Sequence, residues 1–394
     1  MKLFLLLFFS ITIMMAKTIT LKEILSQTKS KHPLFQAKEQ IRLSLEAQSK
    51  ANFASNPVEL SLNGAHAKPN NANDDFEYSV GLSKTLPFGN TKALGLSAQR
   101  LQNEVALLQK EKTLLRLSNR IQNFYHQSCL DKENRLIIEA SLQSYQTLYE
   151  KKKKAYKFHE ISKKELLQLE MQMRTLKQKA KSSLSQEKIS KERLYDLSLI
   201  TKHQPLSCQD ISPLIVQVSF DGIFFSLSQN AYTKELNALD KLEKRYNKNI
   251  DSINISSSYD DELDTKRFGV GIAVPLSFSS EKNEQMHLSI LHQKELKKLE
   301  HINWIQEQVA SKKELEGKLK NAYDTIIMIE ENLAIYRNTL MPLIEKSFRY
   351  GESSSLEYIF GRQKLLELSQ ELIQTKKTYY QTLFKLYSLL ETEI

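Results

Sequence analysis

The side chains that usually carry out catalysis or bind metal ions are few in this chain, and their spacing favours neither. The nearest group of imidazoles comprises His287, His292 and His301, at positions i, i+5 and i+14, which do not share one face of a helix. The sequence contains no His-Glu-x-x-His, Cys-x-x-Cys or glycine-rich phosphate-binding motif. We therefore expect solvated or packed histidines, no catalytic residue, no metal site, no cofactor and no enzymatic activity.

Residues 1–16 indicate a destination outside the cytoplasm. Lys2 is followed by an apolar run that ends before Ala16, which is the pattern of a secretory signal peptide. The alternative is an N-terminal core helix. No cysteine follows the run, so we expect no lipid anchor there. No other segment reaches the ~18 apolar residues of a transmembrane helix, so any membrane-spanning part should consist of strands.

Two cysteines, Cys129 and Cys208, are the remaining reactive side chains, and in an oxidising compartment they could pair. Cys129 precedes a predicted turn near His159 by about 30 residues, or ~45 Å of helix. The returning helix climbs ~55 Å before the chain reaches Cys208. These lengths predict a disulfide that fixes the inter-repeat linker to the helices, and two unpaired, partly buried thiols are the alternative.

The net charge of +10 could suggest binding to nucleic acid. An exported chain does not meet nucleic acid in the cytoplasm, however, and acidic residues are interleaved with the basic ones along the same segments. We therefore interpret most of the basic excess as solvated helix faces and expect no nucleic-acid partner.

The chain repeats itself at a spacing of about 190 residues. Residues 79–88 (SVGLSKTLPF) resemble residues 269–278 (GVGIAVPLSF), and residues 156–165 (YKFHEISKKE) resemble residues 348–357 (FRYGESSSLE). Two matches at one spacing indicate two copies of one structural unit. We predict a first repeat at residues 17–200, a linker at 201–220 and a second repeat at 221–394.

Each repeat contains a long helical segment. Apolar residues recur every seven positions between Leu94 and Leu115, and at steps of three and four in residues 166–184 and 315–336, as in coiled coils. Residues 91–157 and 281–347 each form a run of about 67 residues, which could extend ~100 Å as helix. Gly317 and Pro342 lie in the second run. Return helices are expected at 161–200 and 354–391. Several shorter helices with polar joints are the alternative.

Each repeat also carries a segment in which large apolar residues alternate with small or polar ones, as in a barrel wall. We expect hairpins at residues 57–88 and 251–278, with Asn/Asp-rich loops at 68–75 and 260–264. Hairpins packed on a soluble core are the alternative. The residues that we predict to face lipid are Tyr78, Val80, Leu82, Val270, Ile272 and Val274.

Two hairpins supply four strands, which are too few to close a barrel. An open sheet edge is not tolerated in lipid, so the barrel must be closed by further copies of the chain. A dimer would supply eight strands and a trimer twelve, and the pattern alone does not choose between them.

The order helix, hairpin, long helix, turn, helix, given twice after a signal peptide, resembles the TolC family of outer-membrane efflux channels. Leu21–Leu25 with His32-Pro33 resembles the opening helix of the family, with His in place of the usual Asn. Asn56-Pro57 precedes the first strand, Leu86-Pro-Phe-Gly89 and Val274-Pro-Leu276 resemble the hairpin ends, and residues 348–357 resemble the Tyr-x-x-Gly turn. His159 stands where the first turn of the family usually has Gly.

The resemblance implies a mainly α fold with a small β part, in which duplicated coiled-coil-like helical hairpins and two β-hairpins contribute to an oligomeric transmembrane barrel. It implies a homotrimer in the outer membrane of a Gram-negative bacterium, with a periplasmic extension. A periplasmic adaptor and an inner-membrane pump, of RND type, would deliver metal cations or drugs. The Leu-Pro-Phe-Gly form is closer to the heavy-metal branch of CzcC and CusC types. The alternative function is a structural coiled-coil protein of the periplasm or surface without transport activity.

The two predicted turns would form the end of the tunnel that contacts the adaptor. The first turn is rich in lysine, and Lys163 and Lys164 open the next helix, where the helix dipole disfavours cations. We expect a basic collar that meets acidic groups of the adaptor, and a simply solvated cluster is the alternative. The residues predicted to make this contact are Lys157, His159, Lys163, Lys164, Glu165, Arg349, Tyr350, Gly351 and Glu352.

Overall fold

The computed structural model describes residues 18–67, 75–201, 204–216, 225–247, 250, 252–262, 265–275 and 281–393. The predicted signal peptide lies outside the described residues, as do most of the loop predicted at 68–75 and the end of the second predicted hairpin at 276–278. The chain forms two compact units, and each unit contains parts of both predicted repeats. The helical unit comprises Met1–Gln36, Leu114–Phe224 and Ala310–Ile394, and the sheet unit comprises Ala37–Thr113 and Phe225–Val309.

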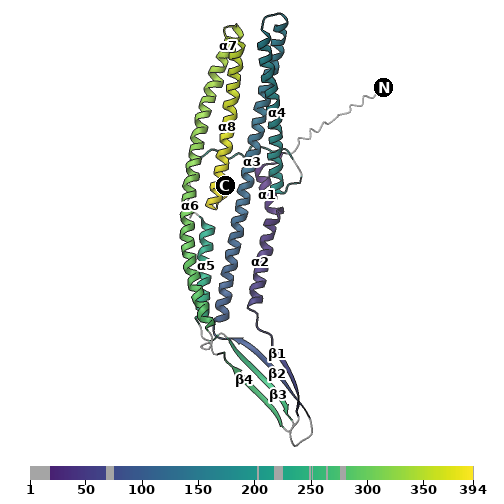
Figure 1. Ribbon diagram of the computed structural model, residues 1–394, viewed down its shortest axis with the longest axis vertical. Coiled ribbons are helices and arrows are strands. Elements are labelled where there is room, and N and C mark those ends of the chain that lie inside the picture. The colour runs from purple at the N-terminus through teal and green to yellow at the C-terminus, as the bar shows by residue number, and fades with distance from the viewer. Residues whose placement is uncertain are drawn as a thin grey trace, which may run out of the picture. The chain divides into compact units, whose positions relative to one another are not determined.

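The helical unit is built from two helical hairpins, which are visible in Figure 1 as α3 beside α4 and α7 beside α8. The first consists of the C-terminal part of α3 (Thr91–Lys157) and α4 (Lys163–Ser198). The second consists of the end of α6 (Lys282–Ile335), α7 (Met341–Tyr350) and α8 (Ser355–Leu390). A core of Ile138, Tyr145, Leu169, Leu176, Ile359 and Leu366 joins α3, α4 and α8.

The two return helices begin and end in the same way. Both α4 and α8 contain 36 residues, and both begin after a serine whose side chain accepts a hydrogen bond from the third helical N–H. These serines are Ser162 and Ser354, and the helices end at Leu199 and Glu391, which both adopt the left-handed conformation. The two serines are 192 residues apart (354 − 162), and so are the two left-handed residues (391 − 199). The geometry at the helix ends therefore repeats together with the sequence.

The second long helix contains one local irregularity. A π-helical turn, Tyr336–Leu340, separates α6 from α7, and the N–H of Met341 bonds the carbonyl of Tyr336. Pro342 follows directly, and in a regular helix its ring would clash with the carbonyl four residues earlier. The extra residue of the π turn relieves this clash without ending the helix. Gly317, in contrast, lies inside α6 without interrupting it.

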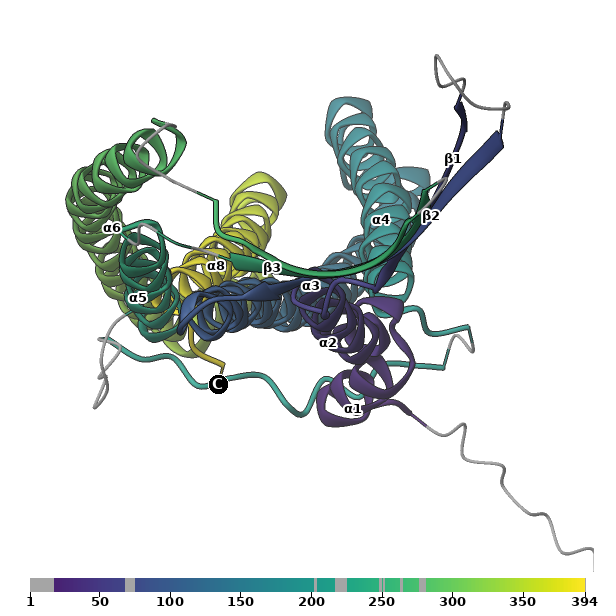
Figure 2. The ribbon, with the colours of Figure 1, turned by 90° about the horizontal axis from the view of Figure 1, so that it is seen from below.

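In the sheet unit, four antiparallel strands follow one another in the order β1-β2-β3-β4. Their bounds are Glu59–Ala67 for β1, Asp75–Pro87 for β2, Ser252–Glu262 for β3 and Thr265–Ala273 for β4. Pairing of β2 with β3 joins the hairpin of one repeat to that of the other. Figure 2, a view from below, shows that the strands follow a bent sheet.

Two predicted boundaries of the second hairpin differ from the structure. Asp260 and Asp261 were expected in a loop but lie in β3, where they face Arg267 and Lys266 of β4. Asp261 pairs with Lys266 at 3.8 Å, and opposite charges that face each other across a strand pair favour pairing of the strands. Val274 was expected inside the last strand but lies just beyond β4. Pro275 follows it and has no N–H for the ladder, which favours an early end of the strand.

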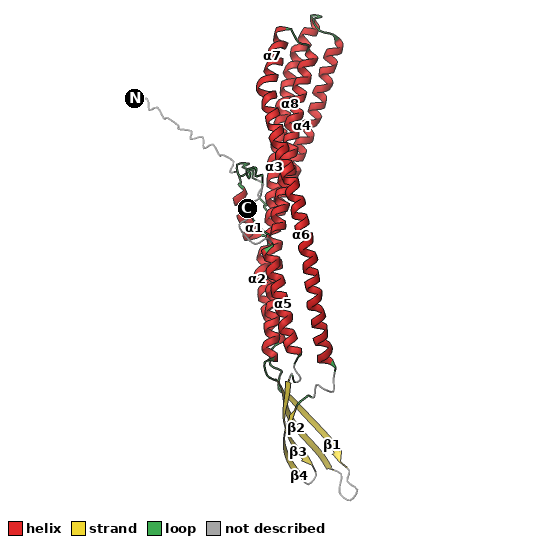
Figure 3. Cartoon of the chain, turned by 90° about the vertical axis from the view of Figure 1, so that its left-hand side faces the viewer, coloured by secondary structure: helices red, strands yellow, loops and turns green. Residues whose placement is uncertain are grey.

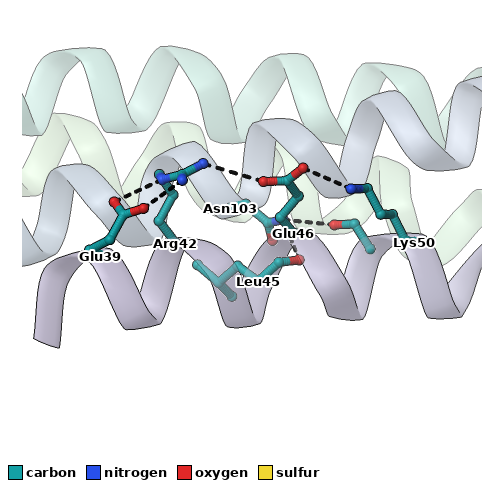
Figure 4. A network of polar contacts seen from close by, with 7 residues as sticks. Glu39, Arg42, Leu45, Glu46, Lys50 and Asn103 are labelled. Carbon is teal, nitrogen blue, oxygen red and sulfur yellow. Dashed lines mark hydrogen bonds and ion pairs between the residues drawn. The ribbon is translucent and has the colours of Figure 1, made fainter.

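The helices of the sheet unit, drawn in red in Figure 3, lie along the N-terminal part of α3. The α2 helix (Pro33–Asn52) carries a chain of ion pairs from Glu39 through Arg42 and Glu46 to Lys50, drawn in Figure 4. Asn103 of α3 ties this helix down, because its amide donates to Ser49 Oγ at 2.7 Å and to the carbonyl of Leu45 at 3.0 Å.

On the other side of the sheet unit, α5 (Ser226–Tyr246) is joined to α6. Lys294 of α6 lies 2.6 Å from Asp240 and 2.7 Å from Glu243 of α5. Close packing also constrains α3, since a Cβ at Gly95 would lie 2.4 Å from the ring of Phe53. A larger residue at this position would therefore force the ring of Phe53 to move.

Candidate functional site

The sheet has one apolar face and one small or polar face. The register aligns Leu60, Leu82, Ser257 and Val270 in one row and Leu62, Val80, Tyr259 and Phe268 in the next, all on the same face. The opposite face carries Ser61, Gly81, Ser258 and Gly269 in one row and Glu59, Ser83, Ser256 and Gly271 in the next. Five of the residues predicted to face lipid, all except Val274, therefore lie on one side of one sheet.

The side chains of the apolar face are exposed. Val270 and Ile272 are each 71% exposed, whereas Gly269 and Gly271, which alternate with them, are half-buried. Tyr78, Val80 and Leu82 are likewise exposed, and the small residues that alternate with them are half-buried. Leaving rows of large apolar side chains in water would be costly, because each loses ~1.5–3 kcal/mol of burial. An exposed apolar surface of this kind indicates contact with lipid or another protein.

Each outer strand of the sheet pairs on one side only, as far as the described strands go. Among the described strands, β1 pairs only with β2, and β4 pairs only with β3. Each outer strand therefore presents a row of backbone N–H and C=O groups that can pair with a further strand.

The two turns of the helical unit share one backbone geometry. His159 follows α3 with φ +59°, and Gly351 follows α7 with φ +78°, so both adopt the left-handed conformation. The turn of the first hairpin therefore has the geometry that glycine favours, although its residue is His. The cost of this conformation for a residue with a Cβ is roughly 1–2 kcal/mol.

We expect His159→Gly to raise, and Gly351→Ala to lower, the thermal unfolding midpoint of the purified protein, because the first change relieves left-handed strain and the second introduces it. Each effect should correspond to about 1 kcal/mol. Gly317→Ala, in the middle of α6, serves as a control and should stabilise by a similar amount, since helical geometry favours Ala over Gly. Shifts of the same sign for His159→Gly and Gly351→Ala would contradict the assigned turn geometry.

The equivalent turns differ in charge. Residues 150–165 contain seven lysines and three glutamates, a net charge of +4, whereas residues 342–357 contain one lysine, one arginine and three glutamates, a net charge of −1. Lys157, His159, Lys163, Lys164, Arg349, Tyr350, Gly351 and Glu352 are exposed, and Glu165 is half-buried as the capping partner of Ser162. Within the described part of the chain, Lys157, Lys163 and Lys164 make no ion pair. The first turn is therefore a surface with uncompensated positive charge.

Each turn also presents an aromatic ring that the sequence patterns did not single out as a pair. Phe158 is 74% exposed and Tyr350 is 69% exposed, and they precede the two left-handed residues. The signal for Phe158 was available in the sequence, because it is separated from Tyr350 by the same 192 residues as the turns. Exposed aromatic residues are frequent anchors in protein interfaces.

The two cysteines lie together. Cys129 of α3 and Cys208 of the linker form a disulfide with Cα atoms 5.5 Å apart. We call the described part of the linker, residues 204–216, the strap. It packs on a core that includes Ile24, Ile121, Tyr125, Leu194 and Tyr195, from α1 (Leu21–Lys31), α3 and α4.

The histidines singled out by spacing do not form a site. His301 stacks on Tyr232 with ring centroids 3.6 Å apart, and its desolvation lowers its pKa. His287 lies 3.9 Å from Glu243, and His292 is exposed. No group of His, Cys, Asp and Glu residues that could hold a metal ion occurs among the residues described above. None of the helices in this described part of the chain has the length and apolarity needed to cross a membrane.

No protein-family model matches the sequence, and a comparison with curated proteins finds no match. Solved structures do match the fold over nearly the whole chain. CusC is 16% identical with a TM-score of 0.77, covering 95% of this chain and 92% of its own. The outer-membrane channel CmeC of Campylobacter jejuni is 13% identical with a TM-score of 0.75, covering 94% and 85%.

The outer-membrane channel MtrE of Neisseria gonorrhoeae, in its open state, is 12% identical with a TM-score of 0.74, covering 94% of this chain and 89% of its own. Identities this low establish the architecture and not the activity. The chain therefore has the fold of these outer-membrane channels, a TolC-like arrangement of long helices and a small four-stranded antiparallel sheet.

Proposed function

We propose that this chain is an outer-membrane channel, a passive exit duct in a tripartite efflux system of a Gram-negative bacterium. The observation that carries the proposal is the sheet, with an exposed apolar face and two unpaired edges. A sheet in lipid must satisfy all of its backbone groups, so it must be closed. The fold shared with CusC, CmeC and MtrE supports the same interpretation.

Copies of the chain close the barrel. The β1 edge of one copy pairs with the β4 edge of the next, and three copies supply twelve strands. The apolar face then contacts lipid, and the Ser/Gly face lines a water-filled lumen, which is the usual arrangement of outer-membrane barrels. The helices extend the duct into the periplasm. The chain itself supplies no energy and carries out no chemistry.

The two turns are the proposed contact with a periplasmic adaptor, which links the channel to an inner-membrane pump of RND type. Metal cations or drugs delivered by the pump are the transported substrates. The net charge of +4 at the first turn fits an acidic surface on the adaptor. Charges at such a rim mainly set the association rate and the register of the two partners.

We expect Lys163→Glu combined with Lys164→Glu to weaken efflux without affecting assembly, because the substitutions reverse the charge that attracts the adaptor. Association should slow by on the order of tenfold. The measurement is resistance to a panel of metal cations and drugs in a strain that lacks the native gene. Lys177→Glu combined with Lys181→Glu, on exposed positions of the same helix, is the control. Full resistance of the first variant at normal expression would show that the cluster is merely solvated.

Fractionation and conductance test the function itself. The protein should stay in the outer membrane after a high-salt wash, and the purified protein should produce stable ion-conducting events in a planar lipid bilayer. A structural coiled-coil stalk, the alternative function, would be released by the wash and would conduct nothing. The exposed apolar face of the sheet favours the channel over the stalk.

A further inference from the structure

The strap is fastened to the helical unit by aromatic hydroxyls from three helices. Tyr125 of α3 donates to the carbonyl of Ser207 at 3.1 Å, and Tyr195 of α4 donates to that of Gln204. From α8, Tyr380 donates to the carbonyl of Ser212 at 2.6 Å. The hydroxyl of Tyr379, also on α8, donates to the carbonyl of Ile215 and accepts from its N–H, at 3.0 and 2.7 Å. The strap therefore bridges α3, which ends at the first turn, and α8, which begins after the second turn.

A buried histidine holds the middle of the strap. His126 of α3 has no exposed surface, and its Nδ1–H donates to the carbonyl of Gln122 at 2.7 Å. Its Nε2 accepts the backbone N–H of Ser212 at 2.9 Å. This bond requires the neutral ring, because a protonated imidazole has a donor at both nitrogens and cannot accept. The rings of Tyr380 and Phe384 lie against it, with centroids 4.5 and 5.0 Å away.

We propose that the strap is an acid-sensitive latch: protonation of His126 at Nε2 removes the acceptor of the Ser212 N–H and releases residues 209–216 from α3 and α8. The disulfide between Cys129 and Cys208 keeps the released segment tethered at its N-terminal end. Release removes a connection between the two helical hairpins. The latch does not depend on the proposed transport role, since it is contained within the helical unit.

The surroundings of His126 leave its protonated form without compensation. Tyr125 on α3 and Tyr380 on α8 stay protonated in this pH range, because desolvation raises the pKa of both. On the strap, Asp210 accepts the N–H of Leu21 at 3.0 Å. Asp131 of α3 and Lys377 of α8 pair with each other. Within the described part of the chain, His126 has no ion-pair partner that would stabilise an imidazolium.

The sign of the pH dependence follows from burial. Desolvation lowers the pKa of His126 from 6.5 to about 4. The closed latch binds its proton less readily than the released one, so the closed form is fully stable above pH 6.5 and loses stability as the pH falls towards 4. This difference in pKa between the released and the closed form shifts the equilibrium towards release. Relative to pH 7, the shift is about 20-fold at pH 5 and more than 100-fold at pH 3.5.

Hydrogen exchange of the full-length protein in detergent tests the latch. The amides of Ser212 and Ile215, which bond to α3 and α8, should lose about 20-fold of their protection between pH 7 and pH 5 after correction for intrinsic exchange rates. Amides in the middle of α4 should keep theirs, which separates release of the strap from general unfolding. Unchanged protection of residues 209–216 down to pH 3.5 would overturn the proposal.

Two variants separate the titration of His126 from other acid effects. His126→Gln offers a carbonyl acceptor that does not titrate, so the pH-dependent loss should disappear. Tyr380→Phe removes one bond to the strap but leaves His126 in place, so protection should fall at every pH while the pH-dependent loss remains. The same pH dependence in His126→Gln as in the native protein would overturn the proposal. Loss of the pH dependence in Tyr380→Phe, where His126 and its bond to Ser212 remain, would also overturn the proposal.

Discussion

Replacing Val80 with Arg should prevent the chain from assembling in the outer membrane. Val80 lies in a row with Leu62, Tyr259 and Phe268, near the middle of the apolar face. An arginine at the bilayer midplane costs ~2–4 kcal/mol, and every copy in a closed barrel would carry it. The quantity to measure is the amount of assembled protein in washed outer membranes, compared with the native chain.

Two further arginine substitutions serve as matched controls, one in a different row of the apolar face and one on the polar face. Ile272→Arg should be milder, because Ile272 shares a row with Ile255 and Lys84, where a cation is already present. Ser79→Arg, next to Val80 but on the polar face, should assemble, since its side chain would enter the lumen. Normal assembly of Val80→Arg together with loss of Ser79→Arg would mean that the two faces are inverted.

Removing the disulfide should be the most destabilising change in the helical unit. Cys129 and Cys208 are 79 residues apart, and the loss of such a cross-link costs about 4 kcal/mol in the chain-entropy account. We expect Cys129→Ala, Cys208→Ala and the double variant to lower the free energy of unfolding by the same amount, because each removes the same bond.

Thiol labelling gives the direct check of this bond. The native protein, denatured without reductant, should label no cysteine, and after reduction it should label both. Two labelled thiols per chain before reduction would contradict the cross-link and would leave the strap attached by hydrogen bonds alone.

The helical part of this fold is largely readable from the sequence because its signals are local. The first long helix was predicted at residues 91–157, and α3 spans Thr91–Lys157. The strand parity likewise placed Val80 and Val270 on one face, because a period of two fixes the side of each residue. Pairing between β2 and β3 could not be derived in this way, since it joins segments far apart in the chain.

The bounds of the second hairpin and the attachment of the strap could not be predicted, because both depend on tertiary contacts that no local sequence pattern encodes. Asp260 and Asp261 have the composition of a loop, but they pair with β4 in the sheet, and Asp261 forms an ion pair with Lys266 across the hairpin. His126 lies within a regular helix and carries no motif, and its role depends on Ser212, 86 residues later. The left-handed geometry of His159 does not follow from the residue type, because histidine does not favour this conformation and the surrounding structure must maintain it.

The central claim is that copies of this chain complete one barrel through their β1 and β4 edges. Native mass spectrometry of the protein extracted from outer membranes measures the number of chains directly. The account predicts a complex of three disulfide-bonded chains that dissociates only when the sheet unfolds. A folded single chain, extracted from the membrane with both sheet edges unpaired, would contradict it.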